Sequence, residues 1–176
     1  MIFTLTEVPA AVAVDVEKHA DPRGFFARVW SSEEFAGQGL STDFVQANMA
    51  FNHRKGTLRG MHYQIAPHQE AKLVRCTRGA IFDAVLDLRP DSPTYRQWAG
   101  LELSSDNHRM LYIPEGCAHG YQTLADDTEV FYLVSASYSP QAERGIRYDD
   151  PSFGIDWPLD VSTISEKDRA WPLYSG

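Results

Sequence analysis

The run AIFDAVLDL at residues 80–88 alternates between two faces, as the side chains of a β-strand do. Asp83 and Asp87 share one of these faces with Ile81 and Val85. A carboxylate on an otherwise apolar strand face either caps a turn or points into a polar cavity. The run alone leaves both interpretations open for each aspartate.

Nine further runs of this kind follow one another along the chain, bounded by glycine, proline and polar turn residues. They cover Ala11–Val16, Phe25–Trp30, Phe44–Phe51, Leu58–Gln64, Lys72–Thr77, Trp98–Leu103, Arg109–Ile113, His119–Thr123 and Val130–Ser137. One helix stands out, because Ser31 and Glu34 resemble a capping box and predict a short helix that ends near Gly37. Many short strands with few helices predict an all-β sandwich or barrel.

Length and composition fit a single domain over residues 1–176. The chain is 43% apolar and 12% aromatic, which is enough to fill a core, and neither a repeat nor a low-complexity linker divides it. No apolar run approaches the roughly 18 residues of a membrane span. The first residues lack the pattern of a secretory signal, and two cysteines form no disulfide framework. We therefore expect a soluble cytoplasmic protein with no membrane partner.

The net charge of −8 argues against a nucleic-acid partner. The charge is unevenly distributed, since residues 23–78 carry eight basic and four acidic side chains. A basic segment within an acidic protein indicates a site for a small anion. The alternative is chance clustering of charges on solvated strand faces.

Two histidines, His62 and His119, each begin or lie within a predicted strand. In a barrel, strands that start side by side can bring both into one cavity, and the alternative for each is a hydrogen-bonded core histidine. A metal-binding barrel usually offers a second histidine close after the first. Here Gln64 occupies that position, and His68 and Glu70 fall in an expected loop. The pattern disfavours a metal site, and a metal-dependent oxygenase is kept only as an alternative.

Lys72 and Tyr132 are polar residues on predicted strands. Lys72 shares a face with Val74 and Cys76, where its ammonium group could lie at a barrel mouth or donate to a developing oxyanion. Tyr132 alternates with apolar neighbours, and packing of its ring explains it without a catalytic role. Near the C-terminus, Ser165 is suited to cap a helix.

Nine short segments, spread over nearly the whole chain, match a family pattern in order. They are Asp21–Phe26, Phe44–Asn48, Leu58–Gln64, Lys72–Arg75, Phe82–Arg89, Ser92–Thr94, Ile113–Gly120, Trp157–Pro158 and Ser165–Asp168. Together they resemble the nucleotide-sugar epimerase family of dTDP-4-dehydrorhamnose 3,5-epimerase. Each segment is weak evidence alone, but so many in the same order make the resemblance highly specific.

The resemblance implies a cupin-like antiparallel β-barrel or jelly roll of two sheets with a few short helices, assembled as a homodimer and working without metal or other cofactor. It implies an isomerase of deoxysugar and polysaccharide biosynthesis. The substrate would be a dTDP-4-keto-6-deoxyhexose, dTDP-4-dehydro-6-deoxyglucose, and the product dTDP-4-dehydrorhamnose. A ketone at carbon 4 acidifies the hydrogens on carbons 3 and 5, so one enolate-type mechanism can invert either centre or both.

Carried over residue by residue, the resemblance implies that His62 is the general base and Asp168 its carboxylate partner. Lys72 would donate to the 4-keto oxygen, and Tyr132 would be the general acid. The positions that match substrate-binding ones are Arg23, Phe26, Arg28, Gln46, Asn48, Arg59, His119, Tyr138, Glu143 and Lys167. Arginines among them suit a diphosphate, which would account for the basic segment.

Four positions depart from the family pattern, namely Arg28, Ala47, Met49 and Leu133. They bear on which nucleotide and sugar the protein takes, and on whether one centre or both are inverted. The alternative function in the same fold is a mono-epimerase or ketoisomerase acting on another nucleotide-linked 4-keto sugar. The alternative of another class is a non-catalytic sugar-binding cupin.

Overall fold

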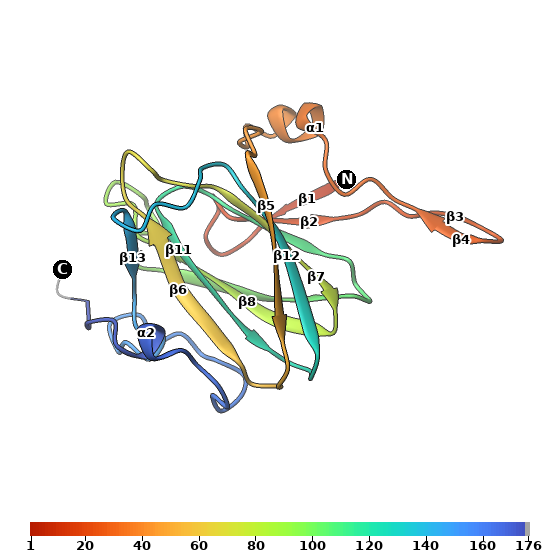
Figure 1. Cartoon of the computed structure of the whole chain (residues 1–176). Helices are drawn as coiled ribbons and strands as arrows, with labels where there is room; N and C mark the ends of the chain where they lie inside the picture. Colours follow the sequence, from red (N-terminus) through yellow and green to blue (C-terminus); the bar gives the residue numbers. More distant parts are fainter. Residues whose placement is uncertain (175–176) are drawn as a thin grey trace.

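A computed structural model describes residues 1–174 and arranges them as two β-sheets that face each other (Figure 1). The first sheet has six strands in the order β1 (Ile2–Leu5), β2 (Val12–Asp15), β10 (Met110–Ile113), β7 (Lys72–Arg78), β12 (Thr128–Val134) and β5 (Gln46–Asn52). The second has five, in the order β13 (Glu143–Gly145), β6 (Leu58–Gln64), β11 (Cys117–Thr123), β8 (Ala80–Asp87) and β9 (Trp98–Ser104). Neighbouring strands are antiparallel throughout both sheets. The predicted all-β architecture of two antiparallel sheets is confirmed.

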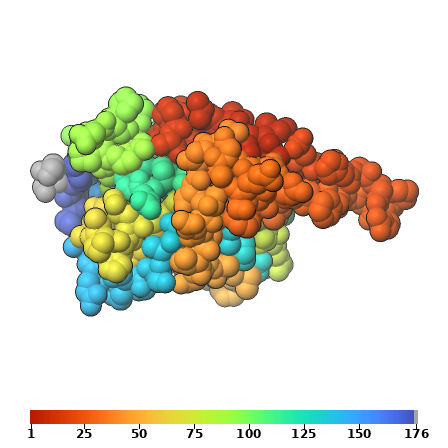
Figure 2. Space-filling model, turned by 90° about the horizontal axis from the view of Figure 1, so that it is seen from above, coloured from red at the N-terminus to blue at the C-terminus, as the bar shows by residue number. Residues whose placement is uncertain are grey.

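A two-stranded hairpin, β3 (His19–Asp21) and β4 (Gly24–Phe26), stands apart from both sheets. We call residues 19–28, which contain this hairpin, the arm. The arm projects away from the body of the molecule (Figures 1 and 2). Its hairpin residues are all exposed, and the Phe25 ring lies beside the His108 ring, with 5.1 Å between the ring centroids.

Two short helices, α1 (Ser32–Gly37) and α2 (Glu166–Arg169), begin at serine caps. The Ser31 side chain accepts a hydrogen bond from the Glu34 N–H, as the capping-box pattern predicts. Ser165 does the same for the Asp168 N–H at 3.0 Å. None of the helices among residues 1–174 is long and apolar enough to cross a membrane.

Apolar side chains of both sheets fill the space between them, with Val74 and Val130 from one sheet meeting Ile81 and Val85 from the other. The outward faces are covered separately. Phe35 of α1 packs on the outside of the six-stranded sheet, and the segment after β13 packs on the outside of the five-stranded one. Along β7 the inward positions change from Cys76 and Val74 to Lys72, so the interior becomes polar toward one end.

The predicted elements differ from the observed ones mainly at the N-terminal end. Leu58–Gln64 is a strand with those bounds, but the predicted strand Phe25–Trp30 is wrong beyond Phe26, where the chain leaves the hairpin and enters α1. Strands β1, β3 and β13 were not predicted. Each has three or four residues, which is too short for alternation to be recognisable.

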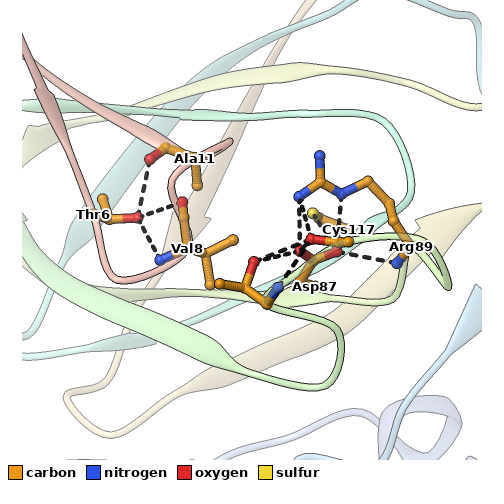
Figure 3. Close-up of polar contacts among 8 residues, drawn as sticks. Thr6, Val8, Ala11, Asp87, Arg89 and Cys117 are labelled. Atoms are coloured by element: carbon orange, nitrogen blue, oxygen red, sulfur yellow. Dashed lines mark hydrogen bonds and ion pairs between the residues drawn. The ribbon is translucent and has the colours of Figure 1, made fainter.

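Asp87 caps the turn that follows β8, which settles one of its two interpretations (Figure 3). Its carboxylate is fully buried and accepts hydrogen bonds from the Arg89 guanidinium at 2.7 and 2.9 Å, and from the hydroxyls of Ser92 and Thr94 at 2.5 and 2.8 Å. Burial acts to raise the pKa of Asp87, but these hydrogen bonds outweigh it and hold the pKa well below its ordinary value of 3.8. The network therefore stabilises the ionised form.

Replacing Asp87 by alanine is expected to lower the free energy of unfolding by about 2 to 3 kcal/mol, because the partners lose a buried acceptor. This loss of stability is smaller than the loss expected for a fully buried ion pair, since the Arg89 side chain is 33% exposed. Folding lowers the pKa of this carboxyl, so its ionised form stabilises the folded protein at any pH above the pKa of the unfolded chain. The difference in stability between wild type and Asp87→Ala should therefore persist at neutral pH and shrink as the pH falls below about 4. Denaturant unfolding across pH measures this, and Asp91→Asn, on an exposed residue of the same turn, is the control.

Candidate active site

The polar end of the interior opens into a cavity of about 510 Å³. Its walls come from both sheets, with β6 and β11 on one side and β5, β7 and β12 on the other, and residues 163–168 close it from the C-terminal segment. A second hollow of about 330 Å³ adjoins it, and both are lined by His62, Lys72 and Tyr132. These three predicted catalytic residues therefore share one continuous site.

His62 and Asp168 meet although 106 residues separate them. The chain after residue 160 runs beside the start of β6, where Thr163 forms a parallel bridge with Thr57, and this places the first turn of α2 against the strand. His62 Nε2 lies 2.5 Å from Asp168 Oδ1, and Asp168 also accepts from the Gly60 N–H at 3.4 Å. Burial acts to raise the pKa of Asp168, but these contacts outweigh it and lower the pKa below its ordinary value.

A β-bulge in β6 lets two residues three positions apart line the same cavity. His119 of β11 pairs with His62, but Tyr121 pairs with Arg59, so the two β6 residues between these pairs oppose one residue of β11. Gly60 lies inside the bulge with φ of 125°, and a Cβ there would come within 2.5 Å of Gly120 Cα. Glycine is required by both the backbone conformation and this close approach.

Tyr132 and Lys72 lie on the wall opposite His62. Tyr132 pairs with Val74, two residues after Lys72, so Tyr132 and Lys72 share the inward face of the sheet. Burial raises the pKa of the Tyr132 hydroxyl, the Glu70 carboxylate raises it further, and Arg59 acts in the opposite direction. Tyr132 is therefore protonated at neutral pH, as a proton donor must be.

Lys72 forms an ion pair with Glu70, whose carboxylate oxygen lies 3.1 Å from the Lys72 Nζ. Both side chains are nearly buried, with 11% and 12% exposed. The ion pair places the Lys72 ammonium group beside the cavity. Glu70 follows a loop and has no signal in the sequence, because its role depends on the fold that brings it to Lys72.

His119 is paired with Asp83, which settles the second aspartate of the opening run. His119 Nε2 lies 2.5 Å from Asp83 Oδ1, and Asp83 is fully buried. Asp83 thus points into the cavity region, where the apolar strand face alone left two possibilities open. Tyr121 lines the same wall, and the sequence analysis did not predict it as a site residue. Burial raises the pKa of its hydroxyl to about 12.

Five of the predicted binding residues form the rim. The Gln46 amide donates to the Asn48 side chain at 2.7 Å, and both line the second hollow. Lys167 Nζ lies 2.5 Å from Glu143 Oε1, and the Tyr138 hydroxyl donates to Glu143 Oε2 at 2.8 Å. Burial acts to raise the pKa of Glu143, but these two partners outweigh it and lower the pKa. The rim is therefore rich in charged and amide groups that suit a polar ligand.

Arg59 lies at the mouth, where its Nε donates to Asn52 at 2.7 Å and its guanidinium remains exposed. The other predicted binding residues do not join the cavity of their own chain. Arg23 and Phe26 lie on the arm, 90% and 70% exposed, and Arg28 pairs with Glu34.

The basic segment is therefore not a single anion site within one chain. Of its eight basic side chains, only Arg59 and Lys72 line the cavity in the described structure. Three of the positions that depart from the family pattern also lie away from it. Leu133 pairs with Ala47, and both alternate with the inward residues, so they face outward, as does Met49.

No group of three His, Cys, Asp or Glu side chains within residues 1–174 comes together as metal ligands do. The histidines of the cavity instead each hold a carboxylate. A cavity that sets a carboxylate-bound histidine against a partly buried tyrosine and an ion-paired lysine defines an enzyme that moves protons on a bound substrate. The barrel is of the cupin-like type.

Comparison with known proteins identifies the family. The model of the dTDP-4-dehydrorhamnose 3,5-epimerase family matches residues 5–175. A dTDP-4-dehydrorhamnose 3,5-epimerase of Sinorhizobium fredii is 40% identical over 98% of this chain and 89% of its own. The chain therefore belongs to the dTDP-4-dehydrorhamnose 3,5-epimerase family, and it is an epimerase, in the isomerase class.

Two solved structures show how the fold is used in relatives. A dTDP-6-deoxy-D-glucose-3,5-epimerase from Legionella pneumophila, in complex with dTDP-4-keto-L-rhamnose, superposes with a TM-score of 0.91 at 36% identity, covering 98% of this chain and 92% of its own. A 3'-monoepimerase from Streptomyces bikiniensis, in complex with dTDP-quinovose, has a TM-score of 0.88 at 32% identity, and the match covers 96% of this chain and 86% of its own. The fold alone thus accommodates inversion at both centres or at one.

Proposed function

We propose that this protein is a cytoplasmic, single-domain epimerase that inverts carbons 3 and 5 of a dTDP-linked 4-keto-6-deoxyhexose. The observation that carries the proposal is the arrangement of His62 with Asp168 on one wall of the cavity and Tyr132 with Lys72 on the other. Inversion of a carbon requires removal of a proton from one face and its return from the opposite face. A sugar held between the two walls meets both groups.

His62 removes the proton in this mechanism. Its Nε2 is held by Asp168, so Nδ1 is the nitrogen free to take the proton. The Asp168 carboxylate orients the ring and stabilises the imidazolium that forms. The electron pair of the broken C–H bond moves to the 4-keto oxygen and gives an enolate, whose charge the Lys72 ammonium stabilises. Tyr132 then donates a proton to the carbon from the other side.

The remaining groups of the cavity suit the rest of the substrate. Arg59 is placed at the mouth to bind a diphosphate, and the amides of Gln46 and Asn48 offer hydrogen bonds to polar parts of the ligand. His119, held by Asp83, lies on the same wall as His62 and suits a sugar hydroxyl.

A mono-epimerase is the second candidate, because a relative named as a 3'-monoepimerase shares the fold at a TM-score of 0.88. A non-catalytic sugar-binding protein is less well supported. Binding alone needs neither a carboxylate-held histidine on one wall nor a partly buried tyrosine on the opposite wall.

Nuclear magnetic resonance of dTDP-4-keto-6-deoxyglucose incubated with the protein in deuterated water tests the proposal. Deuterium at carbons 3 and 5 together with the doubly inverted product is the expected result. Label at one carbon only would establish the mono-epimerase. Binding without label or product, with the sugars of other nucleotides also unchanged, would leave a non-catalytic binding protein, and metal analysis of the same sample checks for the oxygenase alternative.

The protein is further proposed to act as a homodimer in which the arm of one protomer completes the cavity of its partner. Support comes from the arm, which carries Arg23 and Phe26, two residues that match substrate-binding positions. The arm projects away from the body of its own chain (Figure 2). The outward face of edge strand β5 also exposes apolar side chains, with Val45 just before the strand 62% exposed and Met49 67% exposed. Such a face and an extended arm are typical of surfaces that a second copy covers.

Mixing two weakly active variants tests this arrangement. His62→Ala lacks the base and Arg23→Ala lacks an arm residue, so neither homodimer has a complete site. If arms act across the dimer, mixed dimers regain one intact site, and unfolding and refolding the two together should restore roughly a quarter of wild-type activity. If each arm serves its own cavity, the mixture gains nothing. Sedimentation should give a mass twice that of one chain.

A further inference from the structure

Glu70 is a charged group of the cavity that the mechanism above does not use. Glu70 lies directly before Ala71 and β7, in the turn that joins β6 to β7, and its side chain is 12% exposed. The backbone there is fixed, because Ala71 N–H donates to the Ser135 hydroxyl at 2.7 Å and Ser135 N–H donates to the Ala71 carbonyl at 3.0 Å. The Glu70 carboxylate is therefore held at the floor of the second hollow, beside Lys72 and Tyr132.

A lysine ammonium carries three N–H donors on a flexible stem and can point in many directions. The ion pair of 3.1 Å between the Glu70 carboxylate and Lys72 Nζ restrains the position of the nitrogen beside the cavity. A lysine fixed in this way is ready to bind a developing oxyanion without first reorganising, which is the condition for strong electrostatic stabilisation.

The same carboxylate also faces Tyr132. The charged and titratable groups that line the cavity around this hydroxyl are Glu70, Lys72, Arg59, His62, Tyr63, His119, Tyr121, Tyr138, Glu143, Lys167 and Asp168. Arg59 lowers the pKa of Tyr132, and Glu70 raises it. Asp168 is bound to His62, and Glu143 is bound to Lys167 and Tyr138 at the rim. Glu70 is the carboxylate of this lining that pairs with Lys72 beside Tyr132.

We propose that Glu70 is a positioning residue of this active site, which clamps the Lys72 ammonium toward the substrate oxygen and keeps the Tyr132 hydroxyl protonated as the acid. The inference rests on the proposed function for the roles of Lys72 and Tyr132. The Glu70 carboxylate does not touch the reacting carbons in this account. It acts through its two neighbours, so its removal should change the rate of the proton transfers more than the affinity for the sugar nucleotide.

Two substitutions separate the effect of the Glu70 charge from the effect of its contact with Lys72. Glu70→Gln keeps the size and a hydrogen-bond acceptor but removes the charge, so kcat should fall about 10- to 100-fold with KM changed less than about threefold, and the alkaline limb of the pH profile should move to lower pH. Glu70→Asp keeps the charge but shortens the reach to Lys72, so kcat should fall while the alkaline limb stays near its wild-type position. Glu115→Gln, on an exposed residue, is the control.

A titration that needs no turnover tests the inference independently of the proposed function. In protein labelled with ¹³C at the tyrosine Cζ, the Tyr132 signal is assigned by its loss in Tyr132→Phe, and its midpoint should be lower in Glu70→Gln than in the wild type. An unchanged midpoint and wild-type kcat in Glu70→Gln would overturn the inference. So would a lower melting temperature with an unchanged pH profile, since that is the result of a purely structural ion pair. A wild-type protein inactive on every sugar nucleotide would instead contradict the proposed function, while the Tyr132 titration would still be informative.

Discussion

Replacing His62 by alanine is expected to lower kcat about 10³-fold while the fold is retained. The expectation follows from the typical contribution of a general base to a proton transfer. The His62 side chain is 30% exposed and lies in the cavity wall, so its removal leaves no void in the apolar core. Deuterium incorporation into the substrate should fall by the same factor as product formation, because both steps begin with removal of the proton by this residue.

The matched control is His68→Ala, which makes the same change at an exposed histidine six residues away. It should keep the wild-type rate. Circular dichroism and thermal unfolding of both variants should resemble those of the wild type. A His62→Ala protein that turns over at the wild-type rate would remove His62 from the mechanism, and one that is unfolded would require the milder His62→Asn.

Replacing Tyr132 by phenylalanine is expected to separate exchange from inversion. The ring and its packing remain and only the hydroxyl is lost, so His62 can still remove the proton and Lys72 can still hold the enolate. Without an acid on the opposite wall, the imidazolium returns a proton or deuteron to the face from which it came. Inverted product should fall about 10²- to 10⁴-fold, while deuterium still enters the unreacted substrate.

Nuclear magnetic resonance in deuterated water distinguishes the two outcomes in one experiment. Tyr148→Phe, which removes a hydroxyl outside the cavity, should behave as the wild type. Loss of both exchange and product in Tyr132→Phe, in a folded protein, would show that Tyr132 takes part before the enolate forms. Retention of both would assign the acid to another residue of the wall that carries Tyr132, and Lys72 would be the next to test.

The alternation of residues 80–88 and the recurring short strands determine the fold class from the sequence. This alternation can be recognised from neighbouring residues alone, since apolar side chains recur at every second position of a strand that buries one face. The two helix caps are local in the same sense, because Ser31 and Ser165 bond to an N–H three residues ahead. Local signals of this kind can be identified without knowledge of the rest of the chain.

The family resemblance reaches further than the local signals, because it names residues whose roles the tertiary structure must bring about. His62, Lys72, Tyr132 and Asp168 do gather in one cavity, as the resemblance implies. It also names Arg23 and Phe26, which lie on the arm. Only the three-dimensional shape shows that the arm projects away from the body of its own chain (Figures 1 and 2). A list of matching residues contains no information about which copy of the chain they serve.

The sequence by itself determined the strand pattern and the helix caps. Only the tertiary structure decided that Asp168 would hold His62, that Glu70 would hold Lys72, and that Asp83 would point inward while Asp87 capped a turn. The physical reason is that the first group of features depends on contacts within a few residues. The second depends on sheet register, on the bulge at Gly60 and on the return of the C-terminal segment, all of which join parts of the chain that are distant in sequence.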